Sequence, residues 1–212
     1  MPHSDTLSPP TRAFPAELAE DARAVVAIVP PATTAPHEPF PVVVLGRQLM
    51  IPGRLYSDEP PPEAVSALSP RQRQLLHCLY SRHHDGRVRQ RHLEEIVGSA
   101  DPWVVPYVVQ LAGEYVVEIL VVLRDSLRDL DVPGSELRLA HGRFLVENPE
   151  FFARTQRRIV SYWSCYHLHR WSFRDFPGST VLDLFLSAAS GAAGRRWPSV
   201  APKARTRLDG YC

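Results

Sequence analysis

Residues 69–80, Ser-Pro-Arg-Gln-Arg-Gln-Leu-Leu-His-Cys-Leu-Tyr, carry the clearest sign of fold class in this sequence. The serine can accept a hydrogen bond from a backbone N–H of a first helical turn. Proline is tolerated at the first helical position because its missing N–H would have no partner there. The same pairing of a capping residue with proline recurs at Asp101-Pro102 and Asn148-Pro149. Three such starts predict a mainly α-helical protein.

Apolar spacing extends helices from these starts and adds others. The longest predicted helix, over residues 102–130, is expected at the centre of the core, with Pro106 kinking it or delaying its start. Its many valines leave a strand over residues 116–123 open as an alternative. The helix is favoured because its polar residues fall within about one 100° arc; they are Gln110, Glu114, Glu118, Asp125, Arg128 and Asp129. Further helices are predicted over residues 70–83, 88–97, 149–170 and 180–189.

A β-hairpin is predicted over residues 42–51, with its tight turn at Gly46-Arg47. Residues 1–41 are rich in proline and poor in large apolar side chains, so we expect a mobile segment in which residues 16–29 form a short helix on contact with a partner. Residues 188–212 are expected to be a flexible basic tail. The prediction is therefore a compact helical domain over residues 42–187, with four to six helices and one small N-terminal hairpin.

Composition excludes several classes of protein. The 212 residues carry 24 basic and 23 acidic side chains, a net charge of +1, which fits neither a disordered chain nor a uniformly basic nucleic-acid binder. Three widely spaced cysteines form neither a disulfide framework nor a CxxC zinc pair. We find no signal sequence and no uncharged apolar stretch long enough to cross a membrane. The expectation is a soluble cytoplasmic protein that does not bind membranes.

Three strings resemble a family of proteins from high-GC actinobacteria that has no assigned activity. They are residues 87–93 (RVRQRHL), 101–110 (DPWVVPYVVQ) and 160–163 (VSYW). The resemblance spans roughly residues 42–185 and implies a bacterial origin but no activity. The basic residues fit that origin, because Lys203 is the only lysine among the 24.

Basic charge is concentrated in two segments. Residues 71–92 hold six arginines against Asp85, and residues 151–174 hold five arginines and no acidic residue. Aromatic side chains interleave the second segment, but their helical periodicity predicts that most of them belong to the core. The candidate binding surface consists of Arg87, Arg89, Arg91, Arg154, Arg157, Arg158 and Trp171.

A helix-turn-helix is conceivable from the apolar spacing over residues 93–111. Its second helix would have to read DNA, yet residues 102–110 contain no cation and only Tyr107 and Gln110 as hydrogen-bonding side chains. Those residues are therefore interpreted as core.

Two clusters could support catalysis or metal binding. Glu114 and Glu118 lie one helical turn apart and could act as paired carboxylates if their face lined a cavity. Cys165, His167 and His169 could contribute metal ligands, although on a helix only the first and last would share a face. The sequence contains neither a glycine-rich phosphate loop nor a GxSxG nucleophile motif.

From these observations we predict a non-catalytic binding or interaction protein, without a cofactor, whose partner is another protein or a second copy of the chain. The first alternative is a small enzyme or metal-binding protein that uses Glu114 and Glu118 with His167 or His169. The second is a nucleic-acid binder that uses the arginine-rich helices.

Overall fold

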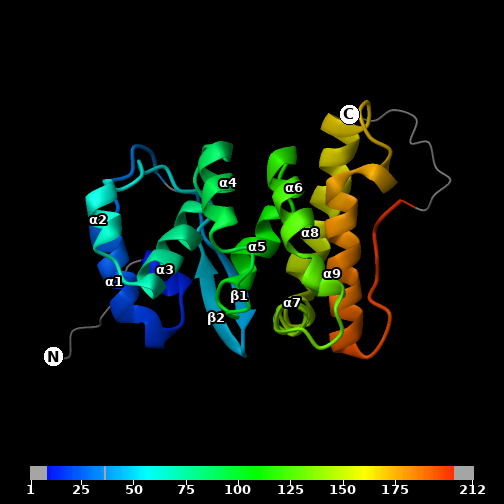
Figure 1. The fold of residues 1–212 in the computed structure, drawn as a ribbon, viewed down its shortest axis with the longest axis horizontal. Helices are drawn as coiled ribbons and strands as arrows, with labels where there is room; N and C mark the ends of the chain where they lie inside the picture. Colours follow the sequence, from blue (N-terminus) through cyan, green and yellow to red (C-terminus); the bar gives the residue numbers. More distant parts are fainter. Residues whose placement is uncertain (1–8, 36, 203–212) are drawn as a thin grey trace. The chain divides into compact units, whose positions relative to one another are not determined.

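The computed structural model describes residues 9–35 and 37–202. Within these residues it is mainly α-helical, with nine α-helices and one two-stranded antiparallel sheet (Figure 1). The prediction of a mainly α-helical fold with a hairpin is confirmed, although the helices are more numerous than expected and most of the predicted ones are shorter. The chain divides into two compact units, Met1–Ile96 and Val97–Cys212, where the sequence suggested one domain.

In unit 1, the helix predicted from Ser69 is present as α3 (Pro70–Tyr80). Its start is a complete capping box: the Ser69 hydroxyl accepts from the Gln72 N–H, and the Gln72 side chain accepts from the Ser69 N–H. The next helix, α4 (Gly86–Glu94), begins behind Asp85, whose carboxylate accepts from the Arg87 N–H. Short α2 (Pro62–Ser66) precedes α3.

The described part of the N-terminal segment is packed within unit 1, which differs from the mobile segment that we expected. It forms η1 (Pro9–Ala13), η2 (Ala16–Leu18) and α1 (Ala19–Ile28). Phe14 and Val25 are buried, and Asp21 of α1 accepts from Arg71 at 2.7 Å and from Gln72 at 3.0 Å on α3. Composition alone missed this packing because a few well-spaced apolar residues suffice when α3 supplies the other half of the interface. Residues 1–8 lie outside the described part.

The hairpin is confirmed as β1 (Phe40–Val44) paired with β2 (Arg47–Ile51). Its turn is at Leu45-Gly46, one residue earlier than predicted, because Val44 pairs with Arg47. Both turn residues have positive φ, 51° and 75°, as a two-residue turn matched to the strand twist requires. This register buries one face of the hairpin, formed by Val42, Val44, Leu49 and Ile51.

In unit 2, the single long helix predicted over residues 102–130 is wrong. The chain forms α5 (Val105–Leu111), α6 (Val117–Ser126) and η3 (Arg128–Asp131), so the alternative of a strand over residues 116–123 is wrong as well. Pro106 lies in the first turn of α5, where proline is tolerated, and Asp101-Pro102 precedes the helix. The break falls at Gly113, which lies against the Arg158 side chain.

The longest helix of unit 2 is α9 (Pro177–Ala193), which packs against α6, α7 (Glu136–Glu147), η3 and α8 (Pro149–Tyr162). Figure 1 shows α9 in orange beside α8. Asn148 does not cap α8 as predicted, because its side-chain amide donates to the Phe144 carbonyl of α7 instead. After α8 the chain continues as a π-helix, Trp163–His167, and then as η5 (Phe173–Asp175).

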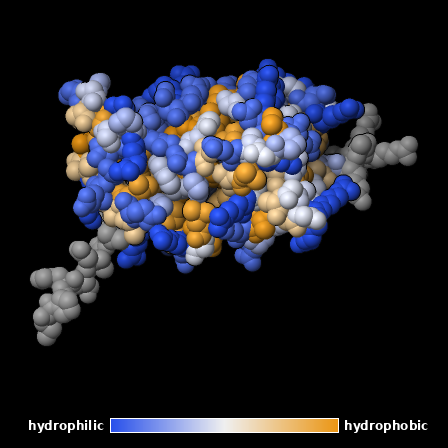
Figure 2. Space-filling view, turned by 60° about the horizontal axis from the view of Figure 1, so that its bottom comes forward, coloured by the Kyte–Doolittle hydropathy of each residue, from blue (hydrophilic) through white to orange (hydrophobic). Residues whose placement is uncertain are grey.

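Residues after α9 return along α8, where we expected a flexible tail. Gln156 of α8 donates to the Pro198 carbonyl and accepts from the Val200 N–H. Residues 203–212 of the predicted tail lie outside the described part of the chain. On the face drawn in Figure 2, hydrophobic side chains are interspersed among hydrophilic ones, so that face presents no single broad apolar area.

Candidate functional site

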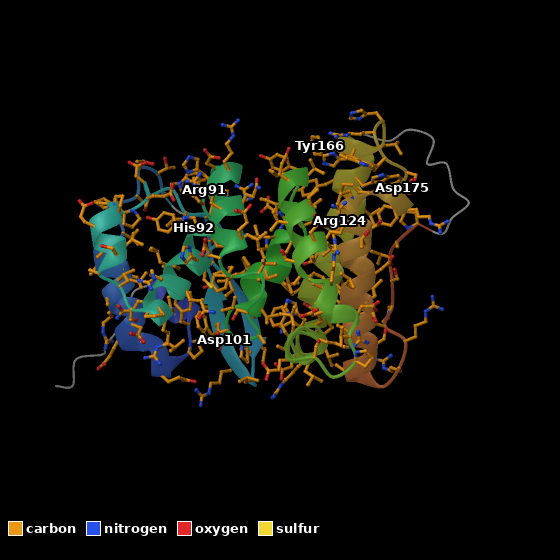
Figure 3. All side chains as sticks on the ribbon, viewed as in Figure 1. Arg91, His92, Asp101, Arg124, Tyr166 and Asp175 are labelled. Atoms are coloured by element: carbon orange, nitrogen blue, oxygen red, sulfur yellow. The ribbon has the colours of Figure 1, made fainter. Side chains whose placement is uncertain are left out.

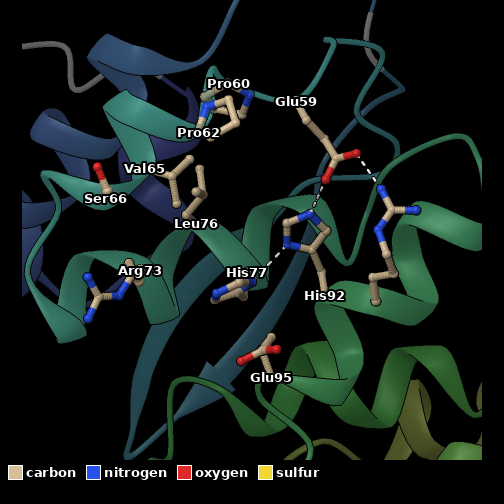
Figure 4. Close-up of a pocket in the computed structure, with 11 residues that line it drawn as sticks. Glu59, Pro60, Pro62, Val65, Ser66, Arg73, Leu76, His77, His92 and Glu95 are labelled. Carbon is tan, nitrogen blue, oxygen red and sulfur yellow. Dashed lines mark hydrogen bonds and ion pairs between the residues drawn. The ribbon is translucent and has the colours of Figure 1, made fainter.

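A pocket of about 440 Å³ opens in unit 1 between α2, α3, α4 and the chain that leads into α2 (Figure 4). The apolar wall consists of Pro60, Pro62, Val65 and Leu76. The polar part of the lining consists of Glu59, Ser66, Arg73, His77, Arg91, His92 and Glu95. Sites for small molecules are typically concave and mostly apolar, with a few convergent polar groups. The size and lining of this pocket fit that description.

Two histidines and a glutamate form a continuous hydrogen-bonded chain in this pocket. Nδ1 of His77 on α3 lies 2.9 Å from Nδ1 of His92 on α4, and Nε2 of His92 lies 2.9 Å from Oε1 of Glu59. Figure 4 shows the two imidazole rings facing one another, with the carboxylate beyond His92. Three residues distant in sequence therefore share one polar chain that ends in the pocket.

The position of each proton follows from the partners. A carboxylate only accepts, so Nε2 of His92 carries the proton that it donates to Glu59. In a neutral His92 the other nitrogen, Nδ1, is then an acceptor, and the His77 Nδ1–H donates to it. The lone pair of His77 is left on Nε2. Within residues 9–35 and 37–202 this Nε2 makes no hydrogen bond, and His77 lines the pocket.

Burial keeps both histidines neutral. It lowers the pKa of His92 below the usual value for histidine, and the hydrogen bond to Glu59 only partly offsets this effect. Burial also lowers the pKa of His77, and the positive charge that His92 can carry lowers it further. Near neutral pH, His77 therefore presents an unprotonated nitrogen, which is the state a proton acceptor needs.

Neighbouring residues fix the geometry of the chain. Arg91 pairs with the second carboxylate oxygen of Glu59 at 2.5 Å. The Tyr80 ring stacks on His92 at 5.1 Å, and its hydroxyl donates to the carbonyl of Asp58 at 2.6 Å, next to Glu59. Burial raises the pKa of Tyr80, so the phenol stays protonated and keeps this bond. The carboxylate and the His92 ring are each held from two sides.

The three arginines predicted from α4 as a binding surface do not act together. Arg87 is exposed, whereas Arg89 is only 1% exposed and donates to the backbone carbonyls of His83 and His84. Arg91 pairs with Glu59 at the pocket. The i, i+2, i+4 spacing places Arg87 and Arg91 on one face of the helix and Arg89 on another, so the three do not form one surface.

The candidate carboxylate pair does not form either. Glu114 is 1% exposed and lies in the break after α5, whereas Glu118 is exposed in the first turn of α6. The prediction depended on one continuous helix, and the turn at Gly113 removes the shared face.

The predicted metal cluster is dispersed. His167 Nε2 donates to the Tyr115 carbonyl at 2.9 Å, and both Cys165 and His169 are exposed. Within the described residues, no three His, Cys, Asp or Glu side chains are placed to hold a metal ion.

The second basic segment lies on unit 2. Arg154 and Arg157 are exposed on α8, and Arg158 is half-buried with its guanidinium 5.7 Å from the Tyr162 ring centroid. Trp171 is half-buried, and the guanidinium carbon of Arg170 lies 4.2 Å from the centroid of the Trp171 ring. The helix-turn-helix finds no support, because all seven residues of α5 are buried and could not reach base edges.

Sequence reasoning missed the pocket because its residues are far apart along the chain. Glu59 and His92 are 33 positions apart and His77 and His92 are 15 apart, so no helical or strand spacing relates them. The only available signal was the presence of histidines on two adjacent predicted helices.

Comparisons with protein families, curated proteins and solved structures found no match. Among the described residues, no helix combines the length and apolar character that crossing a bilayer requires. The function is therefore inferred from the geometry of the site.

Proposed function

We propose that unit 1 binds a small, largely apolar molecule in the pocket and that His77 accepts a proton from it. The observation that carries this proposal is the Glu59–His92–His77 chain, whose free acceptor, Nε2 of His77, lies at the pocket. Nδ1 of His77 donates to His92 and Nε2 makes no hydrogen bond within the described residues, so His77 keeps a nitrogen that can accept a proton.

The chain would act as a proton relay. As a proton arrives at Nε2 of His77, the Nδ1 proton of His77 moves to Nδ1 of His92. His92 then becomes an imidazolium whose charge is balanced by Glu59 at 2.9 Å. The carboxylate of Glu59 stabilises the imidazolium of His92 that forms when the bound molecule has lost its proton. His77 is therefore a stronger base than its burial alone would allow.

Nuclear magnetic resonance of ¹⁵N-histidine-labelled protein tests the resting state. We expect His77 to be protonated at Nδ1 and His92 at Nε2 near neutral pH. The opposite assignment, with His77 protonated at Nε2, would contradict the proposal because His77 would then present no acceptor to the pocket.

Reactivity is tested with 5-nitrobenzisoxazole, a small apolar probe that loses a carbon-bound proton to a base and opens to a coloured phenolate. We expect the full-length protein to accelerate this reaction beyond free imidazole. His77→Gln should lower the rate by about 100-fold, the lower end of general-base effects, and Glu59→Gln should lower it less. His84→Gln, which changes an exposed histidine of the same unit, is the matched control. Equal rates for the wild type and His77→Gln would refute the proposal.

The non-catalytic interaction role predicted from the sequence stays a prediction. A separate surface on unit 2 bears on the second alternative predicted from the sequence, nucleic-acid binding.

A further inference from the structure

Three tyrosine rings gather on unit 2 at the end of α8. Tyr162 and Tyr166 have ring centroids 6.0 Å apart, and Tyr115, from the chain between α5 and α6, lies 6.1 Å from the first and 5.9 Å from the second. Tyr115 is 51% exposed and Tyr166 is 55% exposed. Tyr166 lies beyond the end of α8 (Figure 3). We refer to Tyr115, Tyr162 and Tyr166 as the tyrosine platform.

The π-helix Trp163–His167 explains why the platform is at the surface. The helical periodicity of the aromatic side chains in residues 151–174 predicts that most of them, including Tyr162 and Tyr166, belong to the core. A π-helical turn contains an extra residue and changes the direction of every following side chain. Trp163 remains buried, whereas Tyr166 leaves the core. Such π-helical insertions are frequent at functional sites.

Tyr115 is held in place by a second contact. Its carbonyl accepts from Nε2 of His167 at 2.9 Å, and the His167 ring stacks on fully buried Phe176 at 5.2 Å. The platform is therefore preorganised by the core of unit 2, which reduces the entropy lost when a partner binds.

Arginines that form no ion pair within the described residues adjoin the platform. Arg154, Arg158 and Tyr162 follow one another at four-residue spacing and so lie along one side of α8, with the Arg158 guanidinium 5.7 Å from the Tyr162 ring centroid. Residues 151–174 contain five arginines and no acidic residue. In the described part of the chain none of these five arginines pairs with a carboxylate.

We propose that the tyrosine platform and the Arg154–Arg158 side of α8 bind single-stranded nucleic acid. Exposed aromatic rings stack with unpaired bases, whatever their identity, while arginines neutralise the phosphates. A duplex keeps its bases stacked on one another and offers no faces to the platform. This inference is independent of the pocket in unit 1, and it gives the arginines of α8 a role in binding.

Fluorescence anisotropy of the full-length protein with a labelled thymidine dodecamer, a uridine dodecamer and a duplex of the same length tests the proposal. We expect single strands to bind more tightly than the duplex, with an affinity that falls as salt rises. Tyr166→Ala should weaken binding by about tenfold, as expected for loss of one stacked base, and Tyr166→Phe should retain it because the ring remains.

Arg154→Ala should reduce the slope of log affinity against log salt by about 0.7, the value for one phosphate contact on a single strand. Arg143→Ala is the matched control, since Arg143 is an exposed arginine of unit 2 that already pairs with Glu147. Absence of binding at low salt, equal affinity for the duplex, or no loss in Tyr166→Ala would overturn the proposal. Self-association that Tyr166→Ala abolishes, without nucleic-acid binding, would overturn it in favour of a second copy of the chain.

Discussion

Gly142 of α7 faces the backbone of α9 so closely that a Cβ on residue 142 would lie 2.6 Å from the Ala188 carbonyl oxygen and 3.1 Å from the Ala192 Cβ. Real Cβ atoms do not approach a carbonyl oxygen so closely, and a helix backbone cannot move aside alone. The packing of the two helices therefore depends on a residue without a side chain at this position.

Gly142→Ala should lower the free energy of unfolding by about 1–3 kcal/mol, the usual cost of overpacking. Chemical denaturation measures the change. Gly98→Ala is the control, because a Cβ there meets nothing within 4 Å and the backbone has no positive φ. It should change stability by less than about 0.5 kcal/mol. Similar values for the two variants would contradict the packing argument.

Because His141 is buried as a neutral ring, we expect the stability of the protein to fall in acid. The residue is fully buried, Nδ1 donates to the Leu137 carbonyl at 2.9 Å, and among the residues that the structure describes Nε2 has no hydrogen-bond partner. Burial lowers the pKa of His141 to about 4. In the unfolded chain His141 has a pKa near 6.5, so between pH 6.5 and 4 the unfolded state binds more protons than the folded state. The contribution of neutral His141 to stability is therefore fully present above pH 6.5 and is lost as the pH falls towards 4. The loss attributable to His141 should reach about 3 kcal/mol at pH 4.

Urea unfolding at a series of pH values measures that loss. His141→Leu should have a shallower decline between pH 6.5 and 4, and the difference between the two curves isolates this residue from the other histidines. Parallel curves would show that His141 does not titrate differently in the folded state.

We expect replacement of Arg89 to lower the free energy of unfolding strongly, although the sequence pattern assigned this residue to the surface. Its guanidinium donates to the His83 and His84 carbonyls at 2.9 and 2.8 Å. Arg89→Met keeps much of the volume but removes these charged donors, and should cost about 3 kcal/mol. Arg87→Met, at an exposed position of the same helix, should be nearly neutral. Thermal unfolding compares the two variants, and equal melting temperatures would contradict the structural role of Arg89.

Tyr80 contacts His92 and the carbonyl of Asp58, so we expect its hydroxyl to influence the pocket by holding the residues around Glu59 in place. Tyr80→Phe keeps the ring that stacks on His92 but loses the hydroxyl that holds the Asp58 carbonyl. We expect a loss of about 1 kcal/mol in stability and a slower reaction with 5-nitrobenzisoxazole, because Glu59 is the next residue along the chain. An unchanged rate with an unchanged pH profile would show that the relay does not need this contact.

Local chemistry explains which elements could be predicted. The capping box at Ser69 and the twist-matched turn of the hairpin are decided by residues within a few positions of one another. The long helix failed for the opposite reason. Its polar arc assumed that Gln110 and Glu114 face solvent, yet both are buried. The chain turns at Gly113, where the glycine fits against the Arg158 side chain from a distant helix.

The mainly helical class, the hairpin and the starts of α3 and α8 follow from the sequence, because caps, prolines and apolar spacing act over one or two turns of chain. The two sites follow only from the packing of the helices. The hydrogen bonds of Glu59, His92 and His77 join segments that no periodicity relates. The tyrosine platform depends on a π-helical turn and on Tyr115, whose carbonyl is bound by His167 at a separation of 52 residues. Long-range contacts of this kind depend on how the helices pack, and a local pattern of residues does not specify that packing.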